Sequence, residues 1–490
     1  MQADLIVVGA GGAGLAAAVT AAEGGATVAV LERLPITGGA TVFATGTFAV
    51  ESRLQKQHGI QITTDEAFRQ HMFYTHYLSN PRLVWAIIDK SADTIDWLEE
   101  RGTEFIEPEA FFPGAPRTWH TMKLDGRGIT KALEEVARGL GVQFHFQTRA
   151  KKLIMEGGRV AGVRGEDQDG NTIEYLGKAA LIADGGFANN EEMMVEHTRA
   201  GAHTIEMVVG QVGKEGDGIR MAWEAGAAEE GTRLIQRGPP RVVKKKVQNG
   251  ESKRNRFDKH ITAILRQPFL WVNGNGDRFL DESEWSFPHI GNAMSKQPGQ
   301  VLFNVFDDAS RKRLEEEGIK AGVGMFSDQG MKIPDVLQAM KMSIDDEEAW
   351  IADSVEELAE KTGVDARRLE ATVDEYNRFC DQGRDALFAK DPDYLEPVRT
   401  SPFYAIKGHP THVGTLGGIR INHKTEVIMA GSLTGLDVIP GLYAAGNVAG
   451  GMYGDTYDAS HTIGLTSAFA VISGRIAGEN ALKYIQQCSL

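Results

Sequence analysis

The order of apolar and glycine-rich positions at the start of the chain predicts a βαβ unit over residues 1–33. Leu5–Val8 and Thr27–Leu31 are short, mostly apolar runs, and between them Ala13–Glu23 is an alanine-rich segment closed by two glycines. Continuous apolar runs of this length are typical of strands that are buried on both faces of a parallel sheet. The chain is therefore expected to begin with a Rossmann-like α/β domain.

Further helical and strand patterns follow along the chain. Asn80–Glu100 is expected to form one helix, Ala179–Ile182 a buried strand, and Asp346–Gln382 a long acidic helical stretch. Thr466–Gln487 is expected to form a final helix with small residues on one face. Near Arg237–Pro240 the composition changes, and the segment that follows is charged and mixed.

This change of composition predicts the domain organisation. The fold class is expected to be α/β, with a Rossmann-like domain split by an inserted α+β capping domain. We expect the first part of the Rossmann-like domain at residues 1–239, the capping domain at residues 240–408, and the second part at residues 409–490.

The formal net charge of −15 over 490 residues argues against a nucleic-acid-binding role. One basic stretch runs from Arg241 to His260, and it is interpreted either as a solvated loop or as a docking surface for an acidic electron-donor protein. Its other basic residues are Lys244, Lys245, Lys246, Lys253, Arg254, Arg256 and Lys259.

Cys380 and Cys488 are the only cysteines, which excludes a disulfide framework, a cysteine-ligated iron–sulfur cluster and a c-type haem site. No metal centre is expected, and a reducing cytoplasm is the expected compartment. Leu5–Ala22 carries no charge, but its glycines and its strand–helix pattern argue against a membrane span. Asp4 precedes this run without the positive region of a signal peptide.

Directly after the first strand, Gly9–Gly14 reads G-x-G-x-x-G. In such a turn the first glycine permits the tight bend, the second lets a pyrophosphate approach the backbone, and the third lets helix and strand pack closely. The helix N-terminus favours the negative diphosphate. Glu32 ends the second strand, where a carboxylate accepts ribose hydroxyls and disfavours a 2′-phosphate. The sequence therefore predicts a site for NAD or FAD.

Glycine-rich runs along nearly the whole chain resemble the fumarate reductase/succinate dehydrogenase flavoprotein family, in its soluble single-chain branch. The matching runs are Gly9–Gly14 with Glu32, Gly38–Thr41, Ala183–Phe187, Gly216–Ala222, Val272–Phe279, Thr415–Gly418, Gly441–Gly446 and Gly474–Gly478. The resemblance implies FAD, with the adenine half on the first βαβ unit and the isoalloxazine near the C-terminal glycine run. Membrane-bound members tether the flavin through a histidine after the second strand; Gly39–Thr45 has none, so noncovalent FAD is expected.

Most of the expected cofactor-binding residues lie in these runs or next to them, and Gly46 and Thr462–Gly464 lie outside them. They are Gly9, Gly11, Gly12, Ala13, Gly14, Glu32, Arg33, Gly38, Gly39, Ala40, Thr41, Gly46, Ala183, Asp184, Gly185, Asp217, Gly446, Asn447, Thr462, Ile463 and Gly464.

Three substrate-directed positions differ from the fumarate reductase pattern. The arginine proton donor of that pattern, eight residues after Arg278, corresponds to Ser286. The arginine that clamps the substrate carboxylate corresponds to Tyr457, and a histidine corresponds to Gly414. Because a doubly charged substrate needs such clamps, we expect that this chain is not a fumarate reductase.

Some of these departures are similar to the 3-ketosteroid dehydrogenases. Asn447, Gly414–Gly418, Thr456-Tyr457 and Thr462–Gly464 match that branch, in which a tyrosine bonds the substrate carbonyl. Asp458–His461 replaces the proline- and glycine-rich turn of that family, and its tyrosine base would fall at Ser286. The steroid interpretation therefore stays an alternative.

The candidate catalytic residues are Tyr457, His289, His412, Ser286 and His461. Tyr457 is expected to polarise a carbonyl or to act as an acid, the alternative being a packed tyrosine that lines the flavin. An imidazole that titrates near neutral pH is a natural acid or base, whereas each histidine has a capping or structural alternative. Trp119, His120, Arg266 and Tyr453 are the candidate substrate-binding residues.

The expected activity is hydride transfer through flavin N5 to or from a C–C bond adjacent to a carbonyl or carboxyl. The expected substrate is a small enone, enoate or cyclic ketone, reduction is the favoured direction, and the electrons could come from a separate donor or go to a separate acceptor protein. Two alternatives stay open: a 3-ketosteroid-type dehydrogenase, and a catalytically decayed flavin-binding protein of electron transfer or regulation.

Overall fold

The structure, a computed structural model, describes residues 1–490 except 113, 199–205, 208–211, 243–257, 323–326 and 489–490. The chain divides into two compact units. Unit 1 comprises Met1–Arg199, Val209–Gln236 and Val413–Leu490, and unit 2 comprises Ala200–Val208 and Arg237–His412. The part of the basic stretch from Lys244 to Arg256 lies outside the described residues.

Unit 1 is built on a largely parallel sheet with the strand order β19-β20-β10-β1-β2-β6. Its strands are β1 (Leu5–Val8), β2 (Val28–Leu31), β6 (Gln143–His145), β10 (Ala179–Ile182), β19 (Glu426–Ile428) and β20 (Val438–Ala444). The central strand β1 pairs in parallel with β2 on one side and with β10 on the other, and all its residues are buried. This double pairing explains why Leu5–Val8 is apolar without alternation.

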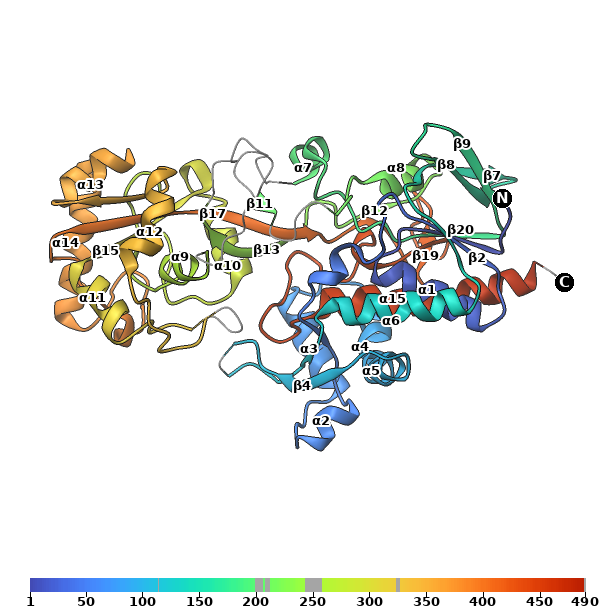
Figure 1. The fold of residues 1–490 in the computed structure, drawn as a ribbon, viewed down its shortest axis with the longest axis horizontal. Helices are drawn as coiled ribbons and strands as arrows, with labels where there is room; N and C mark the ends of the chain where they lie inside the picture. The colour runs from blue at the N-terminus through green and yellow to red at the C-terminus, as the bar shows by residue number, and fades with distance from the viewer. Residues whose placement is uncertain (113, 199–205, 208–211, 243–257, 323–326, 489–490) are drawn as a thin grey trace. The chain divides into compact units, whose positions relative to one another are not determined.

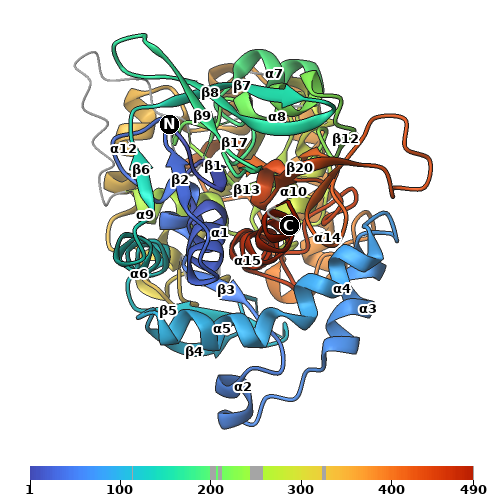
Figure 2. The ribbon, with the colours of Figure 1, turned by 90° about the vertical axis from the view of Figure 1, so that its right-hand side faces the viewer.

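Two helices far apart in sequence lie side by side against this sheet (Figures 1 and 2): α1 (Gly12–Glu23) and α15 (Leu465–Gln487). A Cβ atom added to Gly474 would lie 2.2 Å from the carbonyl oxygen of Ala13, and one added to Gly478 would lie 2.8 Å from that of Ala17. The small residues predicted along one face of the final helix therefore permit backbone-to-backbone packing with α1.

The other elements of unit 1 surround this core, and one of them differs from the prediction. Asn80–Glu100 was expected to be one helix, which is wrong: two helices form, with Lys90 between them. The helices are α2 (Arg53–Gln57), α3 (Thr64–Tyr74), α4 (Pro81–Asp89), α5 (Ser91–Glu100), α6 (Gly126–Gly139), α7 (Glu191–His197) and α8 (Asp217–Glu224). The strands are β3 (Gly46–Phe48), β4 (Phe105–Glu109), β5 (Trp119–Met122), β7 (Arg149–Glu156), β8 (Arg159–Glu166), β9 (Thr172–Leu176), β12 (Glu229–Glu230) and β18 (Gly418–Ile419).

Unit 2 is a mixed sheet covered by helices. Its strands include β14 (Leu270–Val272), β15 (Leu302–Asp307) and β16 (Ala349–Ala352), together with β11 (Glu206–Met207), β13 (Ile235–Arg241) and β17 (Phe403–Thr415), the last two of which also run into unit 1. Its helices are α9 (Asp258–Leu265), α10 (Phe287–Met294), α11 (Asp308–Glu316), α12 (Val336–Asp345), α13 (Val355–Thr362) and α14 (Ala366–Gln382). The helical stretch expected over Asp346–Gln382 is wrong in its first part, because β16 pairs there with β17.

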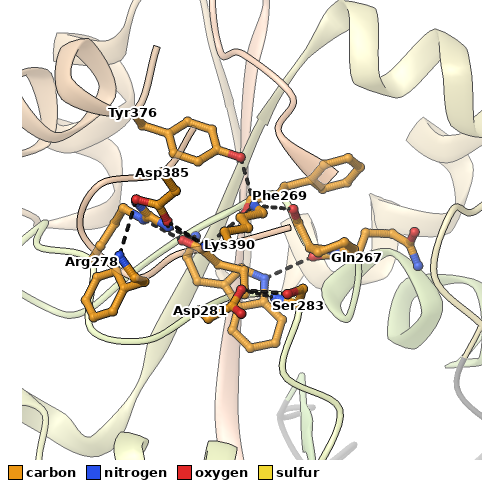
Figure 3. Close-up of polar contacts among 12 residues, drawn as sticks. Gln267, Phe269, Arg278, Asp281, Ser283, Tyr376, Asp385 and Lys390 are labelled. Atoms are coloured by element: carbon orange, nitrogen blue, oxygen red, sulfur yellow. Dashed lines mark hydrogen bonds and ion pairs between the residues drawn. The ribbon is translucent and has the colours of Figure 1, made fainter. Parts of the chain in front are cut away.

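A buried network of charges ties the loops of unit 2 together (Figure 3). Arg278 makes paired hydrogen bonds to Glu282 (2.7 and 2.8 Å) and to Asp385 (3.2 and 2.8 Å). The Nζ atom of Lys390 donates to the carbonyl oxygens of Pro268 and Phe269 and to the hydroxyl of Tyr376. The side chains of Arg278, Lys390, Glu282 and Asp385 have almost no solvent exposure, and the two positive charges compensate the two negative ones.

Among the described helices, none combines the length and apolar character that crossing a bilayer requires.

Candidate functional site

The glycine turn after β1 has the close contacts that its sequence predicted. Gly9 has a φ of +101°, in the region that favours glycine, and a Cβ atom there would lie 2.6 Å from the carbonyl oxygen of Ala183. A Cβ atom on Gly14 would lie 1.9 Å from the carbonyl oxygen of Gly9. No other residue type fits either position without displacing the backbone. Helix α1 starts from this turn, and the N–H group of Gly12 at its start donates to Oγ1 of Thr41 at 3.1 Å. The first N–H groups of a helix have no acceptor within the helix itself.

A cavity of about 840 Å³, which includes space open to solvent, lies at this turn within unit 1. We call it the glycine-turn cavity. The predicted cofactor residues that line it are Gly9, Gly11, Gly12, Ala13, Glu32, Arg33, Gly39, Ala40, Thr41, Ala183, Asp184, Gly185, Asp217, Gly446 and Asn447. Thr148, Arg149, Ala150 and Lys214 also line it and were missed from the sequence.

The carboxylates of the glycine-turn cavity are held in specific contacts. Glu32 accepts hydrogen bonds from the backbone N–H groups of Ala10 and Leu34, each at 2.8 Å, and burial raises its pKa. These two bonds leave its carboxylate lone pairs for further donors such as hydroxyls. Arg149 holds Asp217 through paired bonds of 2.6 and 2.7 Å.

Asp184 and Asn447 each present an oxygen atom that the described residues do not satisfy. The Oδ2 atom of Asp184 accepts from the N–H of Gly218 at 2.8 Å, whereas its Oδ1 atom is buried without a hydrogen bond. Burial raises the pKa of Asp184 to about 7. The buried Oδ1 atom of Asn447 likewise has no hydrogen-bond partner. Unsatisfied buried polar atoms that line a cavity indicate a ligand that completes them.

A second cavity of about 770 Å³, again including space open to solvent, adjoins the first. We call it the aromatic cavity because Phe43, Phe111, Trp119 and Tyr457 line it. The predicted residues Gly46, Ile463 and Gly464 also line it, and a Cβ atom on Gly46 would lie 2.2 Å from Nε1 of Trp119. Ala40, Thr41, Lys214, Asn447 and Ala470 line both cavities.

Tyr457 is a buried side chain of the aromatic cavity, and its hydroxyl is held as an acceptor. The backbone N–H of Gly464 donates to the phenolic oxygen at 3.1 Å, and the side chain of Thr466 also bonds it. Burial raises the pKa of Tyr457 well above its usual value. The phenol therefore stays protonated at neutral pH, and its own O–H remains available to donate.

His461 is oriented by a buried carboxylate. Its Nδ1 atom lies 3.2 Å from Oδ2 of Asp458, and this contact raises the pKa of the imidazole. Asp458 also accepts from the backbone N–H groups of Ser460 and His461. The motif Asp458-x-x-His461 was visible in the sequence, but its role as an oriented pair was missed.

Several predicted residues of unit 1 line neither cavity. Gly14, Gly38 and Thr462 are neighbours in the chain of the lining residues Ala13, Gly39 and Ile463, and the Thr462 hydroxyl donates to the carbonyl oxygen of Asp458. His120 is buried on β5, where Nε2 lies 2.7 Å from Oγ of Ser52, and burial lowers its pKa to about 4.

Tyr453 also lies outside the two cavity walls. It is fully buried, packs 5.8 Å from the ring of Tyr457 between centroids, and its hydroxyl has no hydrogen-bond partner among the described residues.

The remaining predicted site residues lie in unit 2. Ser286 caps α10 and is buried, and its hydroxyl makes no hydrogen bond within the described residues. His289 lies on α10, half exposed, with Nδ1 3.0 Å from Glu284. His412 is buried on β17. Arg266 is buried with its guanidinium 5.5 Å from the ring centre of Phe287, and burial lowers its pKa to about 9.

The chain matches a known protein family over most of its length. A family model described as FAD binding domain matches residues 4–460. The chain belongs to this FAD-binding family. The predicted family resemblance, the α/β fold class and the assignment as an FAD-dependent oxidoreductase are thereby confirmed.

Several proteins are similar to this chain along nearly its whole length. The chain is 33% identical to a vinyl phenol reductase from Lactiplantibacillus plantarum, over 99% of this chain and 98% of that protein. It is 30% identical to a urocanate reductase from Eggerthella lenta, over 98% and 74%. A 3-oxosteroid 1-dehydrogenase from Mycolicibacterium smegmatis is 26% identical, over 96% of each. A solved structure, the open conformation of a flavocytochrome c3 fumarate reductase, matches with a TM-score of 0.72 and 27% identity, over 99% and 78%.

The cavities fit the cofactor of the FAD-binding family. The glycine-turn cavity offers the start of α1 and the carboxylate of Glu32, which suit a diphosphate and a ribose. The buried oxygen atoms of Asp184 and Asn447 need donors such as hydroxyl or ring N–H groups. The aromatic cavity is lined by Phe43, Phe111, Trp119 and Tyr457, whose rings suit contact with a planar ring system.

Proposed function

We propose that this protein is an FAD-dependent reductase of a small alkene whose C=C bond is conjugated with a carbonyl, a carboxyl or a phenol ring. The observation that carries the proposal is Tyr457, a protonated phenol in the aromatic cavity whose oxygen already accepts from Gly464. A phenol held in this way can give its proton to substrate.

In this proposal the two cavities of unit 1 hold one FAD molecule without a covalent bond. The start of α1 holds the diphosphate, Glu32 holds the adenosine ribose, and the aromatic cavity receives the ring. No histidine or cysteine lies among the described residues that line either cavity, which supports noncovalent binding.

When bound and reduced, FAD supplies a hydride through N5 to one carbon of the alkene. The other carbon, or the oxygen conjugated with it, needs a proton. Tyr457 is the proposed donor, and the Asp458–His461 pair returns a proton to the site from solvent, since His461 is partly exposed. The side chains that line the aromatic cavity orient the substrate.

The charge of the aromatic cavity supports the substrate class. Among the described residues that line it, Lys214 is the only one with a charged side chain. A C4 dicarboxylate needs cationic partners at both ends, whereas a neutral alkene or a monoanion needs one at most. We therefore propose a monocarboxylic enoate, an enone or a vinyl phenol in preference to fumarate.

The proposal is tested with the purified, FAD-loaded protein under anaerobic conditions. The flavin is photoreduced, and 4-vinylphenol, cinnamate, urocanate, a cyclic enone and fumarate are then added separately. Reoxidation of the flavin by one of the first four, with formation of the saturated product, is expected. Fumarate serves as the control for the dicarboxylate class.

Two outcomes contradict the proposal. Bleaching of the oxidised flavin by a saturated 3-ketosteroid would favour a steroid dehydrogenase instead. If no alkene reoxidises the reduced flavin, the protein is a flavin-binding carrier or regulator. The physiological electrons, in our proposal, come from a separate donor in a reducing cytoplasm.

A further inference from the structure

Lys214 is a buried lysine that lies at both cavities. It is only 3% exposed and lines both the glycine-turn cavity and the aromatic cavity. Its backbone is fixed by Asn189, which accepts from the Lys214 N–H at 3.1 Å and donates its own N–H to the Lys214 carbonyl oxygen at 2.8 Å. The side chain therefore starts from a defined point at the edge of the site.

The side chain of Lys214 passes beside two glycines, whose lack of a side chain leaves room for it. A Cβ atom on Gly185 would lie 3.7 Å from Cγ of Lys214, and one on Gly414 would lie 3.0 Å from its Nζ atom. Because Gly414 lacks a side chain, the amine occupies the space beside it. The Nζ atom donates to the carbonyl oxygen of Val413 at 3.1 Å.

This ammonium group has no compensating anion among the described residues. Val413 supplies one neutral acceptor, and no ion pair to a carboxylate is formed by Lys214 within the described part of the chain. Burial alone lowers its pKa to about 8. By contrast, Arg33 and Arg149 of the glycine-turn cavity lie beside Glu215 and Asp217. A buried cation without a paired carboxylate is unfavourable unless a ligand brings negative charge.

We propose that Lys214 is the residue that compensates the negative charge of the reduced flavin ring. The proposal rests on the proposed function, since it needs the ring in the aromatic cavity. A flavin ring bound there would gain one negative charge on taking up two electrons and one proton. A cation at the junction of the two cavities stabilises that charge and therefore favours reduction. The N-terminus of α15 at Gly464 and Leu465 adds a smaller, fixed field of the same sign.

The test is the midpoint potential of the bound flavin, measured without substrate by anaerobic dithionite titration against a reference dye. Lys214→Met is expected to make reduction at least tenfold less favourable, a shift of about 30 mV to more negative potential for a two-electron couple. Lys214→Arg keeps the charge and is expected to restore most of the shift. Lys123→Met, which removes the same charge from the surface of unit 1, is the matched control and is expected to leave the potential unchanged.

Lys214→Gln is measured in parallel, so that a polar isostere is available if the methionine variant does not hold FAD. An unchanged potential in either variant overturns the proposal. If that unchanged potential came with a raised KM for an enoate, Lys214 would be a substrate contact instead. Loss of FAD from both neutral variants would assign Lys214 to the diphosphate and would also overturn the proposal.

Failure of this proposal and failure of the proposed function are separate results. The potential is read from the spectrum of the flavin and needs no substrate. The proposed function fails only when the reduced wild-type protein is not reoxidised by any alkene, whatever the potential of the Lys214 variants.

Discussion

The backbone N–H of Gly464 donates a hydrogen bond of 3.1 Å to the phenolic oxygen of Tyr457. Gly464 is also the residue from which α15 starts, with a φ of +80°. The orientation of the phenol is therefore set in part by a backbone position that precedes a long helix. This arrangement fixes the direction in which the tyrosine can offer its proton.

Replacing the phenol tests its role as the acid. In Tyr457→Phe the hydroxyl is lost and the ring remains, so FAD binding is expected to persist while kcat for alkene reduction falls roughly 10²-fold or more. Rapid-mixing oxidation of the reduced flavin by substrate measures the step directly. Tyr484→Phe, on α15 and outside both cavity walls, is the control. Equal rates in Tyr457→Phe and the wild type would remove Tyr457 from the mechanism.

The Asp458–His461 pair predicts a pH effect. Asp458 raises the pKa of His461, so a step that needs the protonated imidazole is present at low pH and is lost as pH rises through that pKa. Asp458→Asn keeps an oxygen acceptor for the backbone N–H groups but removes the charge. The alkaline limb of the kcat profile is expected to move to lower pH. A limb that stays in place would show that His461 does not supply the proton.

The third glycine of the turn predicts a steric effect on cofactor binding. In Gly14→Ala the added Cβ atom would lie 1.9 Å from the carbonyl oxygen of Gly9, so the turn has to move. The variant is expected to lose bound FAD, measured by the absorbance ratio of flavin to protein. Gly139→Ala, in α6 with no atom near its Cβ position, is expected to keep a full complement. A yellow Gly14→Ala protein would contradict this account of the turn.

The buried charges of unit 2 predict a stability effect. Arg278→Met leaves the carboxylates of Glu282 and Asp385 buried without their shared cation, and the free energy of unfolding is expected to fall by about 3–5 kcal/mol. Arg368→Met removes a surface pair with Asp277 and is expected to cost less than about 1 kcal/mol. Urea denaturation followed by tryptophan fluorescence compares the two. A similar loss of unfolding free energy in both variants would show that the stability effect does not depend on burial of the charges.

The sequence predicted those features that depend on neighbouring residues. The first βαβ unit, the strand at Ala179–Ile182 and the glycine turn follow from local patterns of apolar residues and glycine. The break at Lys90 was missed because both flanking segments have helical periodicity. Strand β16 was missed because pairing with β17, more than 50 residues later, overrides its acidic surroundings.

The parts of the site that were missed come from segments distant in sequence. Lys214 donates a hydrogen bond to Val413, which lies 199 positions later in the chain. Arg149 binds Asp217, which lies 68 positions later. No local pattern marks these residues as site residues. One signal was available for Lys214, because it lies two residues before Gly216–Ala222, a run that was already assigned to the family pattern.

The contact of Gly474 and Gly478 with the backbone of α1 has a consequence for biosynthesis. The first strand and its turn are translated hundreds of residues before the helix that packs on α1 and before Gly446, Asn447 and Ala470 of the same cavity walls. The nascent chain therefore carries an open half-site until these later residues have been translated. Cofactor loading becomes a late event, and a truncated chain without α15 would emerge colourless.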